Sequence, residues 1–150
     1  MFVPKRILVP TDFSNYASYA LKHAVDIAKQ YQAEIHLLHV IDEKLHQCLV
    51  DYCLSDAVME QIAKESVKTA TEKLQQEALR VTDINPDVEV SYNVRQGIPY
   101  EEIMNEQEEK QMDLIVIASH GKTGSLKHLM GSVAEKISYG AKSQVLLVKS

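Results

Sequence analysis

Short apolar runs alternate with longer segments of helical periodicity along the chain. The run at 7–10 (ILVP) predicts a strand, and apolar residues then recur every three or four positions over 17–31, which predicts a helix. A second strand is expected at 35–40 (IHLLHV), and a long amphipathic helix is expected at 58–78. The stretch 43–55 between these two elements is interpreted as a connector.

The second half of the chain continues the same alternation. Residues 88–94 alternate apolar with polar, which is typical of a half-exposed strand near a sheet edge. Pro99 suits the first position of a third helix, and the acidic stretch 101–109 is expected to be mostly the solvent-exposed face of that helix. The unbroken apolar runs at 114–118 and 145–148 predict two further strands.

Strands that alternate with helices need crossover connections, which are right-handed and place helices on both faces of a parallel sheet. We therefore expect an α/β fold: a Rossmann-like doubly wound sandwich around a five-stranded parallel sheet. The expected strand order is 3-2-1-4-5, counting strands along the chain. Neither an internal repeat nor a linker divides the sequence, so residues 1–150 are expected to form a single domain.

Charge and hydropathy argue against two classes of function, nucleic-acid binding and membrane insertion. The net charge is -5 with a pI near 5.7, so the chain lacks the basic footprint of a nucleic-acid-binding protein. The apolar runs are too short to span a bilayer, which argues against membrane insertion. The N-terminus lacks the features of a secretory leader, so a cytoplasmic location is expected. Cys48 and Cys53 would remain thiols in that compartment.

Ligands of open α/β sheets bind beyond the carboxyl ends of the strands, and polar residues gather at these predicted ends. The richest segment is 118–132 (ASHGKTGSLKHLMGS), where glycines would let a backbone approach an anion. Ser132 and Glu135 have capping-box spacing, so Ser132 is expected to cap a helix whose free amides attract phosphate. Additional groups for this phosphate site are expected from the same segment, namely Lys122, Gly124, Lys127 and His128.

Two common nucleotide motifs are excluded. A P-loop would need a glycine five positions before Gly121, where the chain has Val116. A dinucleotide fingerprint would follow the first strand, yet no glycine occurs there. No nucleophile elbow or paired Cys and His is evident either, so no catalytic residue is assigned.

The segments PTDFS (10–14) and SHGKTG (119–124) resemble the universal stress protein family, and the resemblance extends over essentially the whole chain. ATP-binding members of that family carry a glycine, two residues, a second glycine, nine residues, then glycine and serine or threonine. This sequence matches at Gly121, Gly131 and Ser132. It departs at Ala118, which stands where the first glycine is expected, and the added methyl group would affect affinity more than fold.

The resemblance implies that the protein binds ATP, or ADP or AMP, with Mg²⁺, and takes part in a stress response. It implies backbone contacts from Val40 to adenine, and it places Asp12 at the ribose or at the phosphate-bound metal. It also implies a homodimer joined through the last strand. The full set of residues expected at the nucleotide is Pro10, Thr11, Asp12, Val40, Ile117, Ala118, His120, Gly121, Gly131, Ser132 and Val133.

Two alternative functions stay open at this point. The first is a slow ATPase in which Asp12 and Mg²⁺ orient a water molecule, although the sequence offers no evident general base beside Asp12. The second is an interaction module that has lost nucleotide binding because of Ala118 and docks an unidentified protein partner. His120 is interpreted either as a phosphate ligand or as a hydrogen-bonded loop residue.

Overall fold

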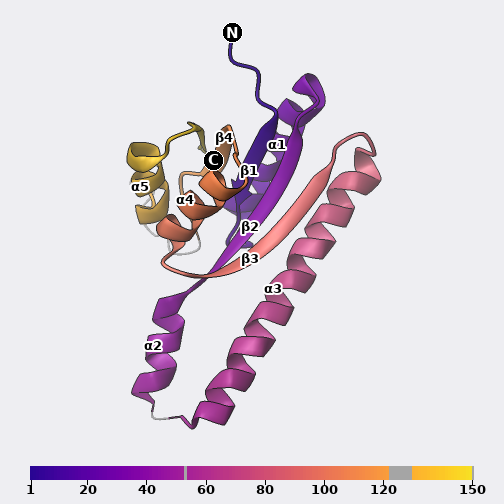
Figure 1. The fold of residues 1–150 in the computed structure, drawn as a ribbon. Coiled ribbons are helices and arrows are strands. Elements are labelled where there is room, and N and C mark those ends of the chain that lie inside the picture. The colour runs from indigo at the N-terminus through magenta and orange to yellow at the C-terminus, as the bar shows by residue number, and fades with distance from the viewer. Residues whose placement is uncertain (53, 122–129, 150) are drawn as a thin grey trace.

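Five strands are connected by five helices in the computed structural model, which describes residues 1–52, 54–121 and 130–149 (Figure 1). The strands are β1 (Arg6–Pro10), β2 (Glu34–Asp42), β3 (Val90–Gly97), β4 (Leu114–Ala118) and β5 (Gln144–Val148). The helices are α1 (Asn15–Tyr31), α2 (Glu43–Asp51), α3 (Asp56–Ile84), α4 (Pro99–Glu109) and α5 (Ser132–Gly140).

The strands form one sheet in the order β3-β2-β1-β4-β5, and every neighbouring pair is parallel. This confirms the predicted architecture and strand order. β1 and β4 are buried along most of their length, as expected for central strands of a parallel sheet. β3 and β5 form the two edges and are partly exposed.

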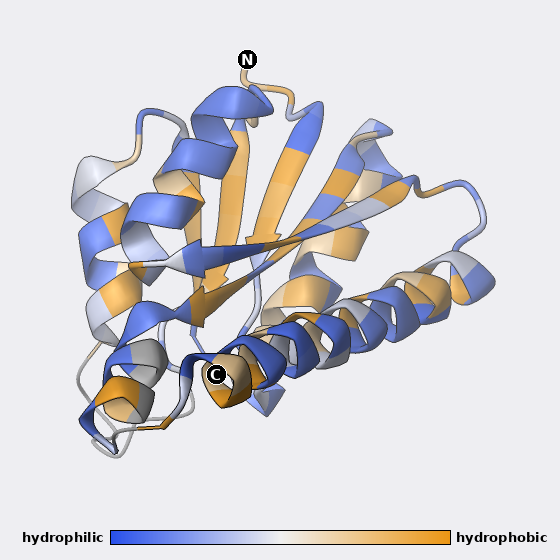
Figure 2. Cartoon of the chain, turned by 60° about the horizontal axis from the view of Figure 1, so that its bottom comes forward, coloured by the Kyte–Doolittle hydropathy of each residue, from blue (hydrophilic) through white to orange (hydrophobic). Residues whose placement is uncertain are grey.

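Two hydrophobic layers hold the helices against opposite faces of the sheet. One layer joins the α1 and α3 side chains to strand residues such as Ile7 and Val9, and the other joins α4 and α5 to Leu8 and Ile115. Consecutive strand residues enter opposite layers because side chains alternate across a strand. Figure 2 shows the central strands as predominantly hydrophobic and the helices as amphipathic.

Side-chain caps explain where three of the helices begin. Ser14, Asp42 and Ser55 accept hydrogen bonds from the first-turn amides of α1, α2 and α3 respectively. The cap at Asp42 starts α2 directly after β2, so the expected connector at 43–55 is largely helical, which corrects that interpretation. In Figure 1, α2 and the N-terminal half of α3 extend beyond the end of the sheet, and the buried residues of α3 begin only at Ala70.

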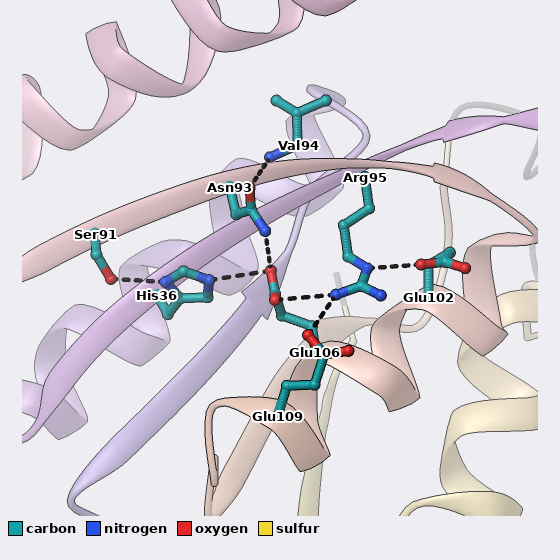
Figure 3. A network of polar contacts seen from close by, with 8 residues as sticks. All are labelled: His36, Ser91, Asn93, Val94, Arg95, Glu102, Glu106 and Glu109. Carbon is teal, nitrogen blue, oxygen red and sulfur yellow. Dashed lines mark hydrogen bonds and ion pairs between the residues drawn. The ribbon is translucent and has the colours of Figure 1, made fainter.

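The expectation of a mostly exposed acidic face on α4 fails at Glu106, whose side chain is 0% exposed. Asn93 Nδ2 donates to Glu106 Oε2 at 2.8 Å, and His36 Nε2 lies 3.3 Å from the same oxygen (Figure 3). Arg95 reaches Glu106 Oε1 at 3.4 Å and also pairs with Glu102 at 2.6 Å. Side chains from β2 and β3 therefore anchor α4 to the sheet through a buried polar network.

Burial alone would raise the pKa of Glu106, but the hydrogen bond from Asn93 and the nearby His36 and Arg95 lower it below its ordinary value. The hydrogen bond to Glu102 raises the pKa of Arg95 further above its already high value. The network is thus built around a buried carboxylate and a charged guanidinium. Within the described ranges, no helix combines the length and apolar character needed to cross a membrane.

Candidate functional site

The turn after β1 fixes the carboxylate of Asp12. Thr11 Oγ1 accepts a hydrogen bond from Phe13 N at 3.0 Å, and Asp12 Oδ1 accepts one from Ser14 N at 3.0 Å. Phe13 adopts a left-handed backbone conformation with φ 64°, and its ring packs on that of His39 with 4.5 Å between centroids. A strained residue held by several contacts is typical of a functional turn.

The segment after β4 lies against this turn. Ser119 N donates to Val148 O at 2.9 Å, and Ser119 O accepts from Gly131 N at 2.7 Å, which brings the start of α5 to the end of β4. A Cβ at position 121 would lie only 2.6 Å from Asp12 Oδ2. The ends of β1 and β4 and the start of α5 therefore converge on one place.

Helix α5 begins at Ser132 with Gly131 as its N-cap residue, and no side chain caps it. The prediction that Ser132 caps this helix is therefore wrong by one position. Glu135 N donates to Gly131 O at 3.0 Å, so Ser132 is already inside the first turn. Because the first amides of a helix have no partner within the helix, the first turn of α5 offers donors to an anion.

A cleft of about 270 Å³ lies at this convergence, close to the lower end of the roughly 300–1,000 Å³ usual for ligand pockets. All eleven residues predicted for the nucleotide site line it. The structure therefore brings together side chains from three separate parts of the sequence, while their contact with a nucleotide stays a prediction. Lys122, Gly124, Lys127 and His128 lie outside the described residues.

The other lining residues were not predicted as nucleotide contacts, namely Ala17, Leu38, His39, Asp42, Pro99, Ile103, Ser119 and Ala134. Of these, Ser119 lies within the predicted glycine-rich segment 118–132. Pro99 and Ile103 come from the first turns of α4, which follow the end of β3. The rule that ligands bind at strand ends would have included them if it had been applied to this edge strand. The sequence predicts only that Leu38 belongs to the core, because the sequence of a buried strand does not show which of its side chains border a cavity.

Two buried polar atoms at the cleft have no hydrogen-bond partner among the described residues. They are the hydroxyl oxygen of Ser119, a residue that is 4% exposed, and Nδ1 of His120. The His120 ring also makes an edge-to-face contact with Tyr16, with 5.9 Å between centroids. Buried polar groups are nearly always paired, so these two atoms are candidate contacts for a water or ligand in the cleft.

A second groove, of about 430 Å³, lies on the α3 side between the N-terminal half of that helix and the end of β2. Phe13 and His39 border it together with Ile41 and Ile62. None of the glycines or helix starts of the first cleft reaches it, and neither unpaired atom lies there. The chemistry for holding an anion is therefore concentrated in the first cleft.

The sheet order, the cleft at the strand ends and the uncapped α5 define a doubly wound α/β fold with a crevice at the carboxyl ends of its strands. The family model described as "Universal stress protein family" matches residues 4–149. The chain belongs to the universal stress protein family, as its sequence motifs predicted.

Individual relatives agree with this assignment. The chain is 36% identical over 153 residues to universal stress protein MJ0577 of Methanocaldococcus jannaschii, covering 97% of this chain and 94% of the relative. It is 30% identical to universal stress protein YxiE of Bacillus subtilis, covering 96% and 98%. A solved structure of MJ0577 superimposes with a TM-score of 0.86 at 32% identity, covering 99% of this chain and 98% of that chain.

Proposed function

We propose that the cleft binds ATP, or the related nucleotides ADP and AMP, and that the protein is a nucleotide-dependent regulator in a stress response. The observation that carries this proposal is the uncapped start of α5 beside the two unpaired polar atoms of Ser119 and His120. Free amides and side-chain donors around one crevice are suited to a phosphate chain. An interaction module without a ligand would gain nothing from leaving these groups unpaired.

The other end of the cleft suits a planar base. Leu38, Val40, Pro99 and Ile103 form an apolar wall between β2 and α4. The pairing of β1 with β2 reaches only Leu38, and β2 continues beside β3 as far as Asp42. Exposed strand backbone next to apolar side chains is the environment that the predicted adenine contacts of Val40 require. The Glu106 network supports this wall because it anchors α4.

Asp12 is the proposed protein ligand of the Mg²⁺ ion. Its carboxylate borders the cleft, and carboxylate oxygens are among the ligands that Mg²⁺ prefers. Within the described part of the chain, no group of three or more potential metal-ligating side chains occurs. Mg²⁺ would therefore arrive with the nucleotide and take most of its ligands from phosphate oxygens and water, with Asp12 as the protein ligand.

Proteins with the same fold offer support at the level of architecture. One universal stress protein was solved in complex with cAMP, and another, from Archaeoglobus fulgidus, in complex with dAMP. They are 17% and 18% identical to this chain, with TM-scores of 0.66 and 0.68. This fold can therefore accommodate an adenine nucleotide, and the residues described above are the ones proposed to do so here.

Calorimetric titration of nucleotide-stripped protein with Mg-ATP tests the proposal. We expect micromolar binding that Gly131→Val abolishes, since valine would place methyl groups where the phosphates approach the start of α5. The backbone at Gly131, with φ -61° and ψ 148°, suits any residue, so this variant should fold. Gly140→Ala at the far end of α5 is the control and should bind normally. No binding of ATP, ADP or AMP to the wild-type protein would favour the interaction module.

We also propose that the protein forms a homodimer through β5, which is a free edge of the sheet. Leu146 is 38% exposed on this strand, and Val145 and Leu147 are only partly buried. An exposed apolar edge strand favours pairing with another strand. The cytoplasmic location and the identity of any protein partner stay predictions.

A further inference from the structure

The backbone N–H and carbonyl of Ser119 are both hydrogen-bonded, whereas its side-chain hydroxyl makes no hydrogen bond to the described residues. Its N–H donates to Val148 O, and its carbonyl accepts from Gly131 N, so the residue joins β4, β5 and the start of α5. Its hydroxyl oxygen is buried and has no hydrogen-bond partner in the part of the chain that the structure describes. The backbone bonds explain why a residue must lie here but give no reason for it to be serine. An unpaired buried hydroxyl costs about 1–3 kcal/mol, which alanine would avoid.

The direction of the Ser119 side chain follows from the strand that precedes it. Ile117 belongs to the hydrophobic layer under α4 and α5, whereas Ala118 belongs to the layer under α1 and α3. Alternation along the strand then directs Ser119 to the same side as Ile117, where the cleft and α5 lie. Ser119 is accordingly one of the residues that line the cleft.

We infer that the Ser119 hydroxyl donates a hydrogen bond to a phosphate oxygen of the bound nucleotide. This inference rests on the proposed function and adds a side-chain contact to a site predicted to act through backbone amides. The cleft that Ser119 lines is also lined by the uncapped first turn of α5 and by His120, whose Nδ1 is likewise unpaired among the described residues. A single acceptor-rich group that satisfies several neighbouring donors is a phosphate rather than a ribose hydroxyl or a base.

The inference predicts that replacing the Ser119 hydroxyl lowers the affinity for nucleotide without lowering the stability of the free protein. In the free protein, Ser119→Ala removes an unpaired polar group, so the melting temperature should be unchanged or higher. Ser14→Ala is the matched control, because that hydroxyl accepts from Ala17 N at 3.2 Å as the cap of α1, and its loss should lower the melting temperature. A structural role for the Ser119 hydroxyl predicts that both variants lose stability, and that result would overturn the inference.

Binding supplies the second half of the test. Ser119→Ala should weaken ATP, ADP and AMP about tenfold or more, while adenosine, measured by competition with a fluorescent nucleotide, changes less than about twofold. An equal loss for adenosine would assign the hydroxyl to ribose or base and contradict the phosphate contact. Unchanged ATP affinity in the variant would reject the inference while leaving the proposed function intact. Absence of nucleotide binding in the wild type would reject both.

Discussion

The carboxylate of Asp12 occupies the space that a side chain at Gly121 would need. A Cβ at position 121 would lie 2.6 Å from Asp12 Oδ2, a separation that real Cβ atoms essentially never show. A side chain at the second glycine of the family motif would therefore have to displace the Asp12 carboxylate. At Gly131 the nearest atom, Ser119 O, is 3.4 Å from such a Cβ, so the protein alone tolerates a methyl group there.

Gly121→Ala should therefore destabilise the protein by about 1–3 kcal/mol, because the new methyl group displaces the Asp12 carboxylate. Urea denaturation of the free protein measures this change. In an Asp12→Ala background the same substitution should cost much less, since the obstructing oxygens are gone. Equal costs in the two backgrounds would show that Gly121 is constrained by something other than Asp12.

Ala118→Gly should leave affinity nearly unchanged and lower stability. The Ala118 side chain belongs to the hydrophobic layer under α1 and α3, so its methyl group faces away from the side of the sheet on which α5 begins. Glycine would remove this contact and loosen the strand, at a cost of about 1 kcal/mol. Calorimetry with ATP and urea denaturation measure the two effects. A variant that binds ATP tenfold more tightly would show instead that the methyl group obstructs the nucleotide.

The sequence was sufficient for the architecture because its strong patterns correspond to buried elements. The apolar run of β4 and the periodicity of α1 reflect burial on both faces and on one face respectively. The site residues could be predicted because polar groups gather at the predicted strand ends and because the family resemblance implied the nucleotide contacts. Thr11, Gly121 and Gly131 were grouped in this way, and all three line the cleft.

Features that depend on contacts between elements could not be predicted from the sequence. Glu106 resembles its acidic neighbours in the sequence, and only pairing with Asn93 and Arg95 from another element shows that it is buried. Helix α2 occupies most of the stretch 43–55 that was interpreted as a connector, and it begins at the Asp42 cap. Ser119 lies in the segment that the sequence singled out, but only the structure shows that its hydroxyl is buried and unpaired among the described residues.

Glu106→Gln should destabilise the protein by about 1–3 kcal/mol at pH 7, because it removes the buried carboxylate that accepts from Asn93 and faces Arg95, although Arg95 keeps its pair with Glu102. The pKa of Glu106 is lowered in the folded protein, so its carboxylate stabilises the fold above the ordinary value of about 4.3. That contribution is lost as the pH falls below this value toward the lower folded pKa. Urea denaturation between pH 7 and pH 3 should therefore show a shallower decline for the variant than for the wild type.

Glu109→Gln is the control for this experiment. Its carboxylate also pairs with Arg95, at 3.0 Å, but the side chain is 60% exposed. Exposed pairs contribute about 0–1 kcal/mol, so this variant should follow the wild-type pH profile closely. If both variants behaved alike, the buried position of Glu106 would have no special role in holding α4.

Leu146→Glu should convert the proposed homodimer into monomers. Leu146 is exposed on the edge strand β5, and a charge at this position would have to be buried if two β5 strands paired. Sedimentation equilibrium across a range of concentrations measures the mass directly. Leu79→Glu, at a residue 54% exposed on α3, introduces the same charge away from β5 and should leave the dimer intact. A wild-type protein that stays monomeric at high micromolar concentration, or dissociation by both variants alike, would show that β5 is not the interface.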